Sequence, residues 1–231
     1  RKLTVGYLSS GNEIVPYQTK QLDIGQIRDI NQLTISALAE ELGVEVIRGG
    51  ITPDDYDTFY QKARELYEQV DVLIMSGGSS VGAKDYTTQV IEALGKPGVL
   101  VHGVSIKPGK PTIFAVANQK PVLGLPGHPA SAMIIFTLFG TEIIQTMSGE
   151  VKKELPTRIQ ARVTKNIPSE PGRADYIRVS LVNKEGEWWA EPILGKSGLI
   201  STLVKSDGIV EIVSIKEGVR QGDWVPVILF K

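Results

Sequence analysis

Apolar runs and amphipathic segments alternate along roughly the first 150 residues of the chain. Short runs rich in β-branched residues predict strands, and apolar positions that recur every three or four residues predict helices. The predicted strands are residues 3–8, 44–49, 70–76, 100–106, 112–117 and 121–125. The predicted helices are residues 27–42, 57–70 and 86–94, with a longer one that begins with Pro129 in its first turn.

This alternation predicts an α/β fold with a mostly parallel sheet and helices on both faces. Residues 70–76 are almost continuously apolar, which is typical of a strand buried on both faces. Asn118 and Gln119 separate two apolar runs and predict an antiparallel hairpin. Ligands of such folds bind at the carboxyl ends of the strands. Polar loops fall at or near these ends at residues 9–13, 52–55, 76–85 and 107–111.

The pattern changes at residues 149–156, a charged stretch that we interpret as a linker. Strand signals then replace helical ones, separated by Gly, Pro, Asn and Asp. They cover residues 158–165, 175–182, 188–194, 208–214 and 224–230. We therefore expect one domain over residues 1–150 and a small all-β, barrel-like domain over residues 151–231.

Composition narrows the choice of partners and compartments. The net charge is −1 among 231 residues, so no global field favours nucleic acid or an anionic membrane. The absence of cysteine excludes disulfides, thiolate metal sites and cysteine nucleophiles. The longest apolar run, Ala130–Ile144, contains Thr141 and Glu142 and is too short for a bilayer span. We expect a soluble, cytoplasmic protein.

The loop SGGSSVGAKD, residues 76–85, has two interpretations on its own chemistry. Glycines let backbone N–H groups approach an anion, serines add donors, and the helix that follows presents its positive end. The loop matches neither standard nucleotide fingerprint. It is therefore either a phosphate cradle or a tight turn between a strand and a helix.

Charged side chains on the neighbouring loops suggest anion and metal binding. Lys107 and Lys110 flank a rigid Pro-Gly turn and suit an oxyanion, although solvated lysines beside such turns are common. Carboxylates from separate loops are how proteins usually hold Mg²⁺. The candidates are Glu13, Asp54, Asp55 and Asp85, and we expect one of the Asp54/Asp55 pair to cap its helix instead.

Other polar residues favour structural roles. Asp29 and Asn31, near the start of a predicted helix, either orient the preceding loop or serve the helix terminus. His128 lies in GLPGHPAS, residues 124–131, where no Ser-His-Asp arrangement is visible. We interpret it as structural or as the edge of a ligand site.

Together these loops resemble the molybdotransferases of molybdenum cofactor biosynthesis, the family of bacterial MoeA and the gephyrin E domain. The resemblance covers essentially the whole chain. Its motifs, in order, are SSGNEIV, GQIRDIN, GITPDD, SGGSSVGAKDY, IKPGKPT, GLPGHPAS, GRADYIRV, AEPILGKSGLISTLVKSDGIV and QGDWVPVIL.

The resemblance implies a three-layer α/β/α, MogA-like molybdopterin-binding domain followed by the family's C-terminal β domain. It also implies a Mg²⁺-dependent reaction in which molybdate enters adenylylated molybdopterin and AMP is released, in a homodimer. Glu13, Asp54 and Asp85 match acidic active-site positions that we assign to catalysis and to the metal, and Lys107 and Lys110 match catalytic positions. The positions that match the cofactor-binding loops are Gly77, Gly78, Ser79, Ser80, Gly82, Pro108, Pro111, Gly124, Pro126 and Gly127.

This sequence departs from the family pattern in three respects. The usual Gly-Asp-Glu is Gly-Asn12-Glu13, which removes one carboxylate but leaves a carbonyl able to ligate a metal. The usual Gly-Asn-Pro contains His128 instead of asparagine. The family's two N-terminal domains are missing, so we expect a fragment or a natural short form. Two alternatives stay open: a MogA-type adenylyltransferase and a non-catalytic molybdopterin-binding scaffold.

Overall fold

The computed structural model describes residues 2–77, 86–149, 157–195, 198 and 200–230. The chain divides into two compact units. The first comprises Arg1–Val104 and Pro111–Val151, and the second comprises Ser105–Lys110 and Lys152–Lys231. The short segment Ser105–Lys110 therefore leaves the first unit and belongs to the second, which the sequence pattern did not anticipate.

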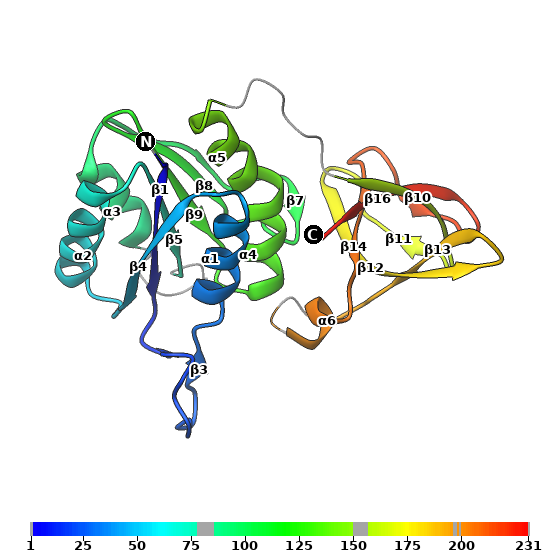
Figure 1. The fold of residues 1–231 in the computed structure, drawn as a ribbon, viewed down its shortest axis with the longest axis horizontal. Helices are drawn as coiled ribbons and strands as arrows, with labels where there is room; N and C mark the ends of the chain where they lie inside the picture. The colour runs from blue at the N-terminus through cyan, green and yellow to red at the C-terminus, as the bar shows by residue number, and fades with distance from the viewer. Residues whose placement is uncertain (1, 78–85, 150–156, 196–197, 199, 231) are drawn as a thin grey trace. The chain divides into compact units, whose positions relative to one another are not determined.

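A six-stranded sheet in the order β4-β1-β5-β9-β8-β6 forms the centre of the first unit (Figure 1). Its strands are β1 (Thr4–Ser10), β4 (Glu45–Thr52), β5 (Val72–Ser76), β6 (Pro97–His102), β8 (Ile113–Ala117) and β9 (Lys120–Leu125). The first four in spatial order are parallel, and β8 and β6 are antiparallel to their neighbours. The prediction of a mostly parallel sheet is confirmed.

Local sequence signals explain the best-predicted strands. Every residue of β5 is buried, as its continuous apolar character indicated. The β8–β9 hairpin turns at Asn118 and Gln119, whose φ angles are 42° and 72°. Positive φ at both central residues is the two-residue turn that matches the twist of antiparallel strands.

Helices cover both faces of this sheet, which makes three layers (Figure 1). α2 (Tyr56–Gln69) and α3 (Tyr86–Leu94) pack on one face and on each other. The opposite face carries α1 (Asn31–Glu41), α4 (Pro129–Ile135), a π-helical turn η1 (Phe136–Gly140) and α5 (Thr141–Met147). The main core packs α2 and α3 against the sheet through residues such as Phe59, Leu66 and Ile91.

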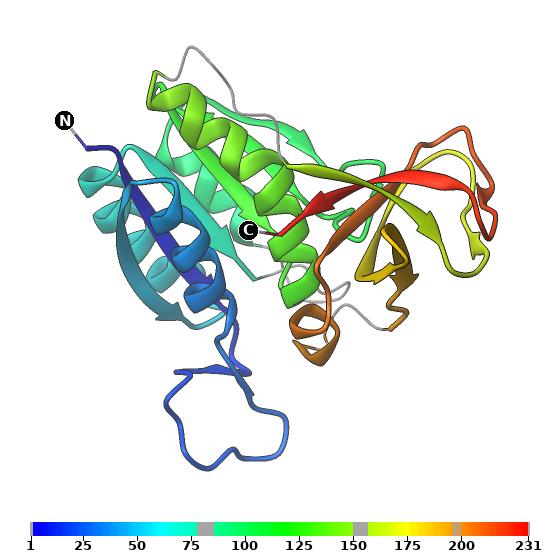
Figure 2. The same ribbon diagram turned by 45° about the vertical axis from the view of Figure 1, so that its right-hand side comes forward.

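The prediction that the first helix begins at Ile27 is wrong. Ile27–Arg28 is a short strand, β3, that pairs in parallel with β2 (Ile14–Val15). Ile27 N–H donates to the Glu13 carbonyl at 2.8 Å, and 53% of the side chain is exposed. Ile27 is therefore not part of a helical face. The strand β3 lies at the base of a loop that projects from the first unit (Figure 2).

The stretch Pro129–Met147, which runs through α4, η1 and α5, passes the length and composition test for a membrane-crossing helix. It is 19 residues long, and its most apolar 18-residue window has a mean hydropathy of 1.4 and is 44% buried within the protein. The sequence analysis expected no segment of this kind. One such helix is weak grounds for a membrane location, because a helix that covers a core passes the same test.

The second unit is a closed circuit of strands. Pairings run β13-β10-β16-β14-β12 and return from β12 to β13, while β7 adds to the outer edge of β12. The strands are β7 (Ile106–Lys107), β10 (Arg158–Val163), β12 (Ala174–Lys184), β13 (Glu187–Pro192), β14 (Gly208–Ile212) and β16 (Trp224–Leu229). A two-stranded piece, β11 (Ile167–Pro168) with β15 (Gly218–Val219), and a short helix, α6 (Ile200–Val204), complete it.

Candidate functional site

The carboxyl ends of three neighbouring strands meet at one edge of the first unit's sheet. In the parallel registers, Ser10 of β1 lies beside Thr52 of β4, and Ser9 lies beside Ser76 of β5. Gly11 N–H donates to the Thr52 carbonyl at 3.1 Å. The loops after β1, β4 and β5 therefore start next to one another, as parallel topology requires.

A reciprocal pair of hydrogen bonds ties the first two loops together. The Asp54 N–H donates to Asn12 Oδ1 at 3.1 Å, and the Asn12 N–H donates to Asp54 Oδ2 at 3.4 Å. The Asn12 carbonyl that we expected to be available to a metal thus accepts a backbone bond. Glu13 follows Asn12 directly and is exposed. Two of the three predicted acidic residues, Glu13 and Asp54, are thereby brought to the same edge.

Asp55 is the residue of the Asp54/Asp55 pair that caps the helix. Its Oδ2 accepts from Thr58 N–H at 2.9 Å and from Thr58 Oγ1 at 2.7 Å, at the start of α2. These bonds, first from the Thr58 hydroxyl and then from its amide, lower the pKa of Asp55. The prediction that one of the pair is a cap is confirmed, and Asp54 is the one that faces Asn12.

Gly77 begins the Gly/Ser loop at a backbone conformation that suits glycine. Its φ is 131°, and a Cβ placed on it would overlap the Ser10 carbonyl oxygen. The end of β5 and the end of β1 therefore approach more closely than any side chain would allow. The other predicted residues of this loop lie outside the described residues: Gly78, Ser79, Ser80, Gly82 and Asp85.

The loop before α4 contains the last group of predicted residues. Gly124 and Pro126 are buried, and a Cβ at Gly124 would lie 3.0 Å from Ile113 Cβ, so close strand packing accounts for that glycine. His128 is the backbone N-cap of α4 and its carbonyl accepts from Ala132 N–H at 2.9 Å. Pro129 follows at the start of the helix, as predicted.

Lys107 and Lys110 belong to the second unit. β7 pairs in parallel with β12, which places Lys107 opposite Asp175 in the register. Both lysine side chains are exposed, and Gly109 between them is buried with a φ of 127°. Pro108 belongs to the same segment, whereas Pro111 begins the return to the first unit. The sequence analysis had placed all of these residues in one domain with the acids.

Arg178 is a buried cation of the second unit that sequence reasoning did not single out. Its guanidinium donates to Thr202 Oγ1 at 2.7 Å and to the Gly195 carbonyl at 3.0 Å, and only 7% of the residue is exposed. Burial lowers its pKa. A charge in the middle of the apolar run DYIRVSLV was the available signal. Arg178 thus links Gly195, shortly after β13, to Thr202 of α6.

Buried polar atoms gather behind the meeting point of the strand ends. Asn31, only 7% exposed, donates from Nδ2 to Ser76 Oγ at 3.1 Å and to the Gly127 carbonyl at 2.8 Å. Within the described part of the chain, Asn31 Oδ1 has no hydrogen-bond partner. The Tyr7 hydroxyl interacts with Ser76 and Ser9, and Ser9 with Asp29, but none of these contacts has ordinary hydrogen-bond geometry. The sequence analysis expected Asn31 either to orient the preceding loop or to serve the helix terminus, and it did not single out Tyr7 or Ser76.

Asp29 is the ionisable group of this buried region. Its Oδ1 accepts from Gln32 N–H at 3.1 Å, while Oδ2 is buried without a partner among the described residues. Burial raises the pKa of Asp29. The nearby Ser9 hydroxyl and the Gln32 N–H lower this pKa, but by less than burial raises it.

Asp29→Asn is expected to stabilise the protein increasingly as the pH rises above about 4. The raised pKa means that the native state holds its proton to higher pH than the unfolded chain does. Ionised Asp29 therefore costs stability above its native pKa, and this cost vanishes below the unfolded value. Asparagine keeps the Oδ1 acceptor for Gln32. Denaturant titrations of both proteins between pH 3.5 and 8 measure the difference; a difference independent of pH would contradict the prediction.

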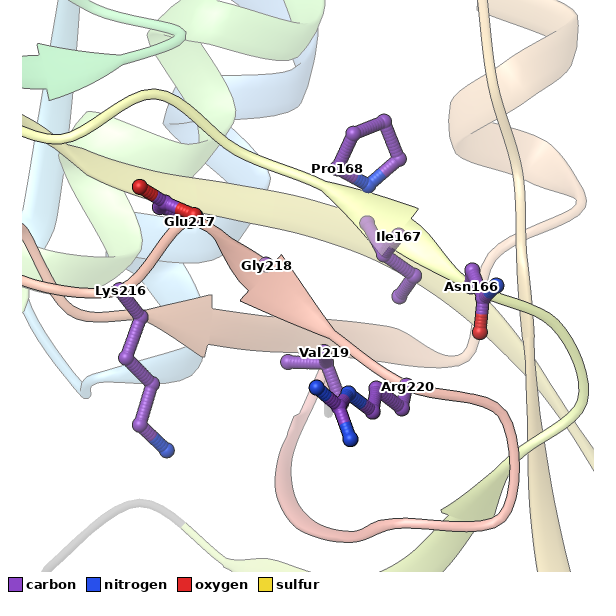
Figure 3. Close-up of a pocket in the computed structure, with 8 residues that line it drawn as sticks. All are labelled: Asn166, Ile167, Pro168, Lys216, Glu217, Gly218, Val219 and Arg220. Atoms are coloured by element: carbon purple, nitrogen blue, oxygen red, sulfur yellow. The ribbon is translucent and has the colours of Figure 1, made fainter.

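Two further structural features bear on where ligands bind. No cluster of three or more His, Cys, Asp or Glu side chains suited to a metal occurs among the described residues, which exclude Asp85. A cavity of about 570 Å³ lies beside β11 and β15 of the second unit, lined by residues 166–168 and 216–220 (Figure 3). It contains none of the predicted site residues.

Comparison with known families covers both units. Residues 6–146 match the model of a probable molybdopterin binding domain. Residues 160–230 match the model of the MoeA C-terminal region, domain IV. These two matches follow each other along the chain in the order that the sequence motifs indicated.

The similarity to individual relatives extends over essentially the whole chain. The chain is 34% identical over 229 residues to a molybdopterin molybdenumtransferase of Haemophilus influenzae, covering 98% of this chain and 56% of that protein. The corresponding protein of Bacillus subtilis is 31% identical, with 100% and 53% covered. A crystal structure of a molybdopterin biosynthesis MoeA protein from Pyrococcus horikoshii superposes with a TM-score of 0.86 at 38% identity, covering 100% of this chain and 55% of that one. The chain thus spans about half the length of these relatives.

Proposed function

Because the chain belongs to the family of probable molybdopterin binding domains and continues into a MoeA-type C-terminal region, we propose that it carries out metal insertion in molybdenum cofactor biosynthesis. The proposed reaction takes adenylylated molybdopterin and molybdate, requires Mg²⁺, and releases AMP. Relatives named molybdopterin molybdenumtransferase support this choice of activity.

The observation that carries the proposal is the Asn12–Asp54 link at the strand ends. It holds the loop of Glu13 against the loop of Asp54, and Gly77 opens the Gly/Ser loop at the same edge through its close approach to Ser10. The two carboxylates therefore lie at the edge of the sheet where that loop begins. This combination suits a phosphoanhydride and its metal ion, and a plain turn does not require it.

The donor types at this edge fit Mg²⁺. Glu13 and Asp54 offer hard carboxylate oxygens, and Asp85 is a third candidate outside the described residues. When bound, Mg²⁺ would supply Lewis acidity and orient the phosphoanhydride. The protein's own contribution is to hold the two carboxylates in register through the Asn12 link, so that they need little rearrangement when the substrate arrives.

Lys107 and Lys110 are proposed to bind an anionic substrate group. Each is an exposed ammonium on a segment fixed by the β7–β12 pairing and by the buried Gly109. Lysine provides a point charge suited to phosphate or molybdate. The sulfur ligands of the inserted metal come from the dithiolene of the pterin, so a chain without cysteine can perform the reaction.

Incubation of the protein with adenylylated molybdopterin, molybdate and Mg²⁺ tests the proposal. We expect the protein to release AMP, which chromatography measures. This release should stop when EDTA removes the Mg²⁺. Absence of both binding and release would contradict it. Adenylylation of molybdopterin by ATP in the same assay would indicate a MogA-type enzyme, and tight binding without release would indicate a binding module.

Asn12→Asp is expected to tighten Mg²⁺ binding by roughly 3- to 10-fold, because it adds a negative charge beside Asp54. The aspartate can still accept from the Asp54 N–H, so the link between the loops is kept. Titration calorimetry with Mg²⁺ alone measures the effect. Asn12→Ala serves as the control that breaks the link; an Asn12→Asp affinity no higher than that of the original protein would argue against a metal at this edge.

Assembly and location are also proposals. The family resemblance predicts a homodimer, and the composition of the chain predicts a cytoplasmic location. Light scattering coupled to size-exclusion chromatography would test the dimer, with a monomer at all concentrations as the contrary result.

A further inference from the structure

The segment Ser105–Lys110, which carries two exposed lysines, joins the second unit through the short strand β7. Two register pairs link β7 to β12, and one of them places Lys107 beside Asp175. The Ala174 N–H also donates to the Ser105 carbonyl at 2.9 Å. The position of both lysines therefore depends on the first residues of β12, the strand to which β7 is added.

An ion pair holds these first residues of β12. The Arg173 guanidinium donates from Nε to Asp175 Oδ1 at 3.1 Å, and its Nη2 lies 2.8 Å from Glu170 Oε2. Only 1% of Asp175 is exposed, so its carboxylate is shielded from water. A buried carboxylate that loses its partner is strongly unfavourable, unlike an acid of an exposed ion pair. The Asp175 side chain is therefore tied to Arg173.

Asp175 also lies at the centre of a row of three strands. In the two registers of β12 it is opposite Lys107 of β7 and opposite Ile212 of β14. Neighbouring strands lie about 4.8 Å apart and share backbone hydrogen bonds, so a displacement of one is passed to the next. The pairing of Asp175 with Arg173 thus acts on the lysine segment through the backbone of β12.

We propose that Asp175, held by Arg173, is a positioning residue that fixes Lys107 and Lys110 for an anionic substrate group. This inference rests on the proposed function, in which these lysines bind molybdate or a phosphate of adenylylated molybdopterin. Asp175 acts through the β7–β12 pairing and does not contact the substrate. A carboxylate beside an anion-binding segment repels the anion by its own charge, so its contribution to that segment is structural.

Asp175→Ala separates positioning from electrostatics by the sign of its effect. It removes a negative charge near the lysines, so electrostatics alone predicts tighter anion binding, whereas loss of position predicts weaker binding. Asp175→Asn is the conservative variant, because its Oδ1 can still accept from Arg173 Nε. Glu187→Ala is the matched control. It also removes one negative charge and breaks an ion pair of the same unit, that with Arg162 at 3.2 Å.

Affinities for molybdate and for adenylylated molybdopterin are measured by titration calorimetry at a temperature where thermal melts show each protein to be native. We expect roughly 10- to 30-fold weaker binding for Asp175→Ala and roughly 2- to 4-fold weaker binding for Asp175→Asn. Glu187→Ala should stay within about twofold. NMR spectra without ligand should show a shifted Gly109 amide signal in Asp175→Ala and not in Glu187→Ala, a readout that a general loss of stability would not produce.

The outcomes separate this inference from the proposed function. If the original protein binds neither ligand, the proposed function is contradicted. If it binds and the lysine segment contributes, but native Asp175→Ala binds as tightly as the original protein or more tightly, the positioning role is overturned. Should Asp175→Ala fail to fold, Asp175→Asn decides by the same sign, and an equal or higher affinity there overturns the role as well.

Discussion

Gly77→Ala is expected to destabilise the protein by about 2–4 kcal/mol and to abolish binding of adenylylated molybdopterin. The added methyl group would overlap the Ser10 carbonyl oxygen, and alanine at a φ of 131° is strained regardless of space. Relief of both problems requires the ends of β1 and β5 to separate. That separation would move Gly77, where the Gly/Ser loop begins, away from Ser10 at the end of β1.

Gly43→Ala is the control for this experiment. Gly43 follows α1 with a φ of 79°, but a Cβ there meets nothing within 4 Å. Its replacement is expected to cost only about 1 kcal/mol, from backbone conformation alone. Urea denaturation of both variants gives the comparison. Equal losses would show that the close approach of Gly77 to Ser10 is not a constraint of the native state.

Lys110→Ala and Lys107→Ala are each expected to weaken binding of adenylylated molybdopterin or molybdate by roughly 10- to 100-fold. Each substitution removes one ammonium from the segment held by the β7–β12 pairing. Because charge carries the effect, the loss should shrink as the salt concentration is raised. Titrations with each ligand separately, at 50 and 200 mM NaCl, identify which anion each lysine binds.

Lys216→Ala is the matched control for the two lysine variants. It removes an exposed lysine of the same unit from the cavity beside β15, which contains none of the predicted site residues. The affinity of this variant should be unchanged. A loss as large as that of Lys110→Ala would indicate a diffuse charge effect, and unaltered affinity in both loop variants would remove the segment from the proposed site.

Local signals allowed much of the fold to be predicted. The continuous apolar run of β5, the two-residue turn at Asn118 and Gln119 and the proline at the start of α4 each act through their own backbone or through direct neighbours. The error at Ile27 has the opposite origin. There the backbone bonds to Glu13 across the β2–β3 pair, and a helical pattern in one sequence window cannot reveal such a partner.

The candidate site was predictable as a set of loops but not as a set of contacts. Parallel topology brings the ends of β1, β4 and β5 together whatever their sequences are. Which acid of the Asp54/Asp55 pair becomes a cap depends on the hydroxyl of Thr58 and on the bond to Asn12. The Asn31 links span 45 and 96 positions and have no signature in the chain.

The strand β7 limits how this protein can be divided or inherited. Ser105–Lys110 contributes β7 to the sheet of the second unit, although the chain on both sides belongs to the first. A gene cut at the apparent linker would therefore separate one strand of the second unit from the other strands. Exchange of either unit between related genes as a single cassette would leave a vacant edge beside β12. Each unit of this protein is therefore expected to be obtained intact only when both are expressed together.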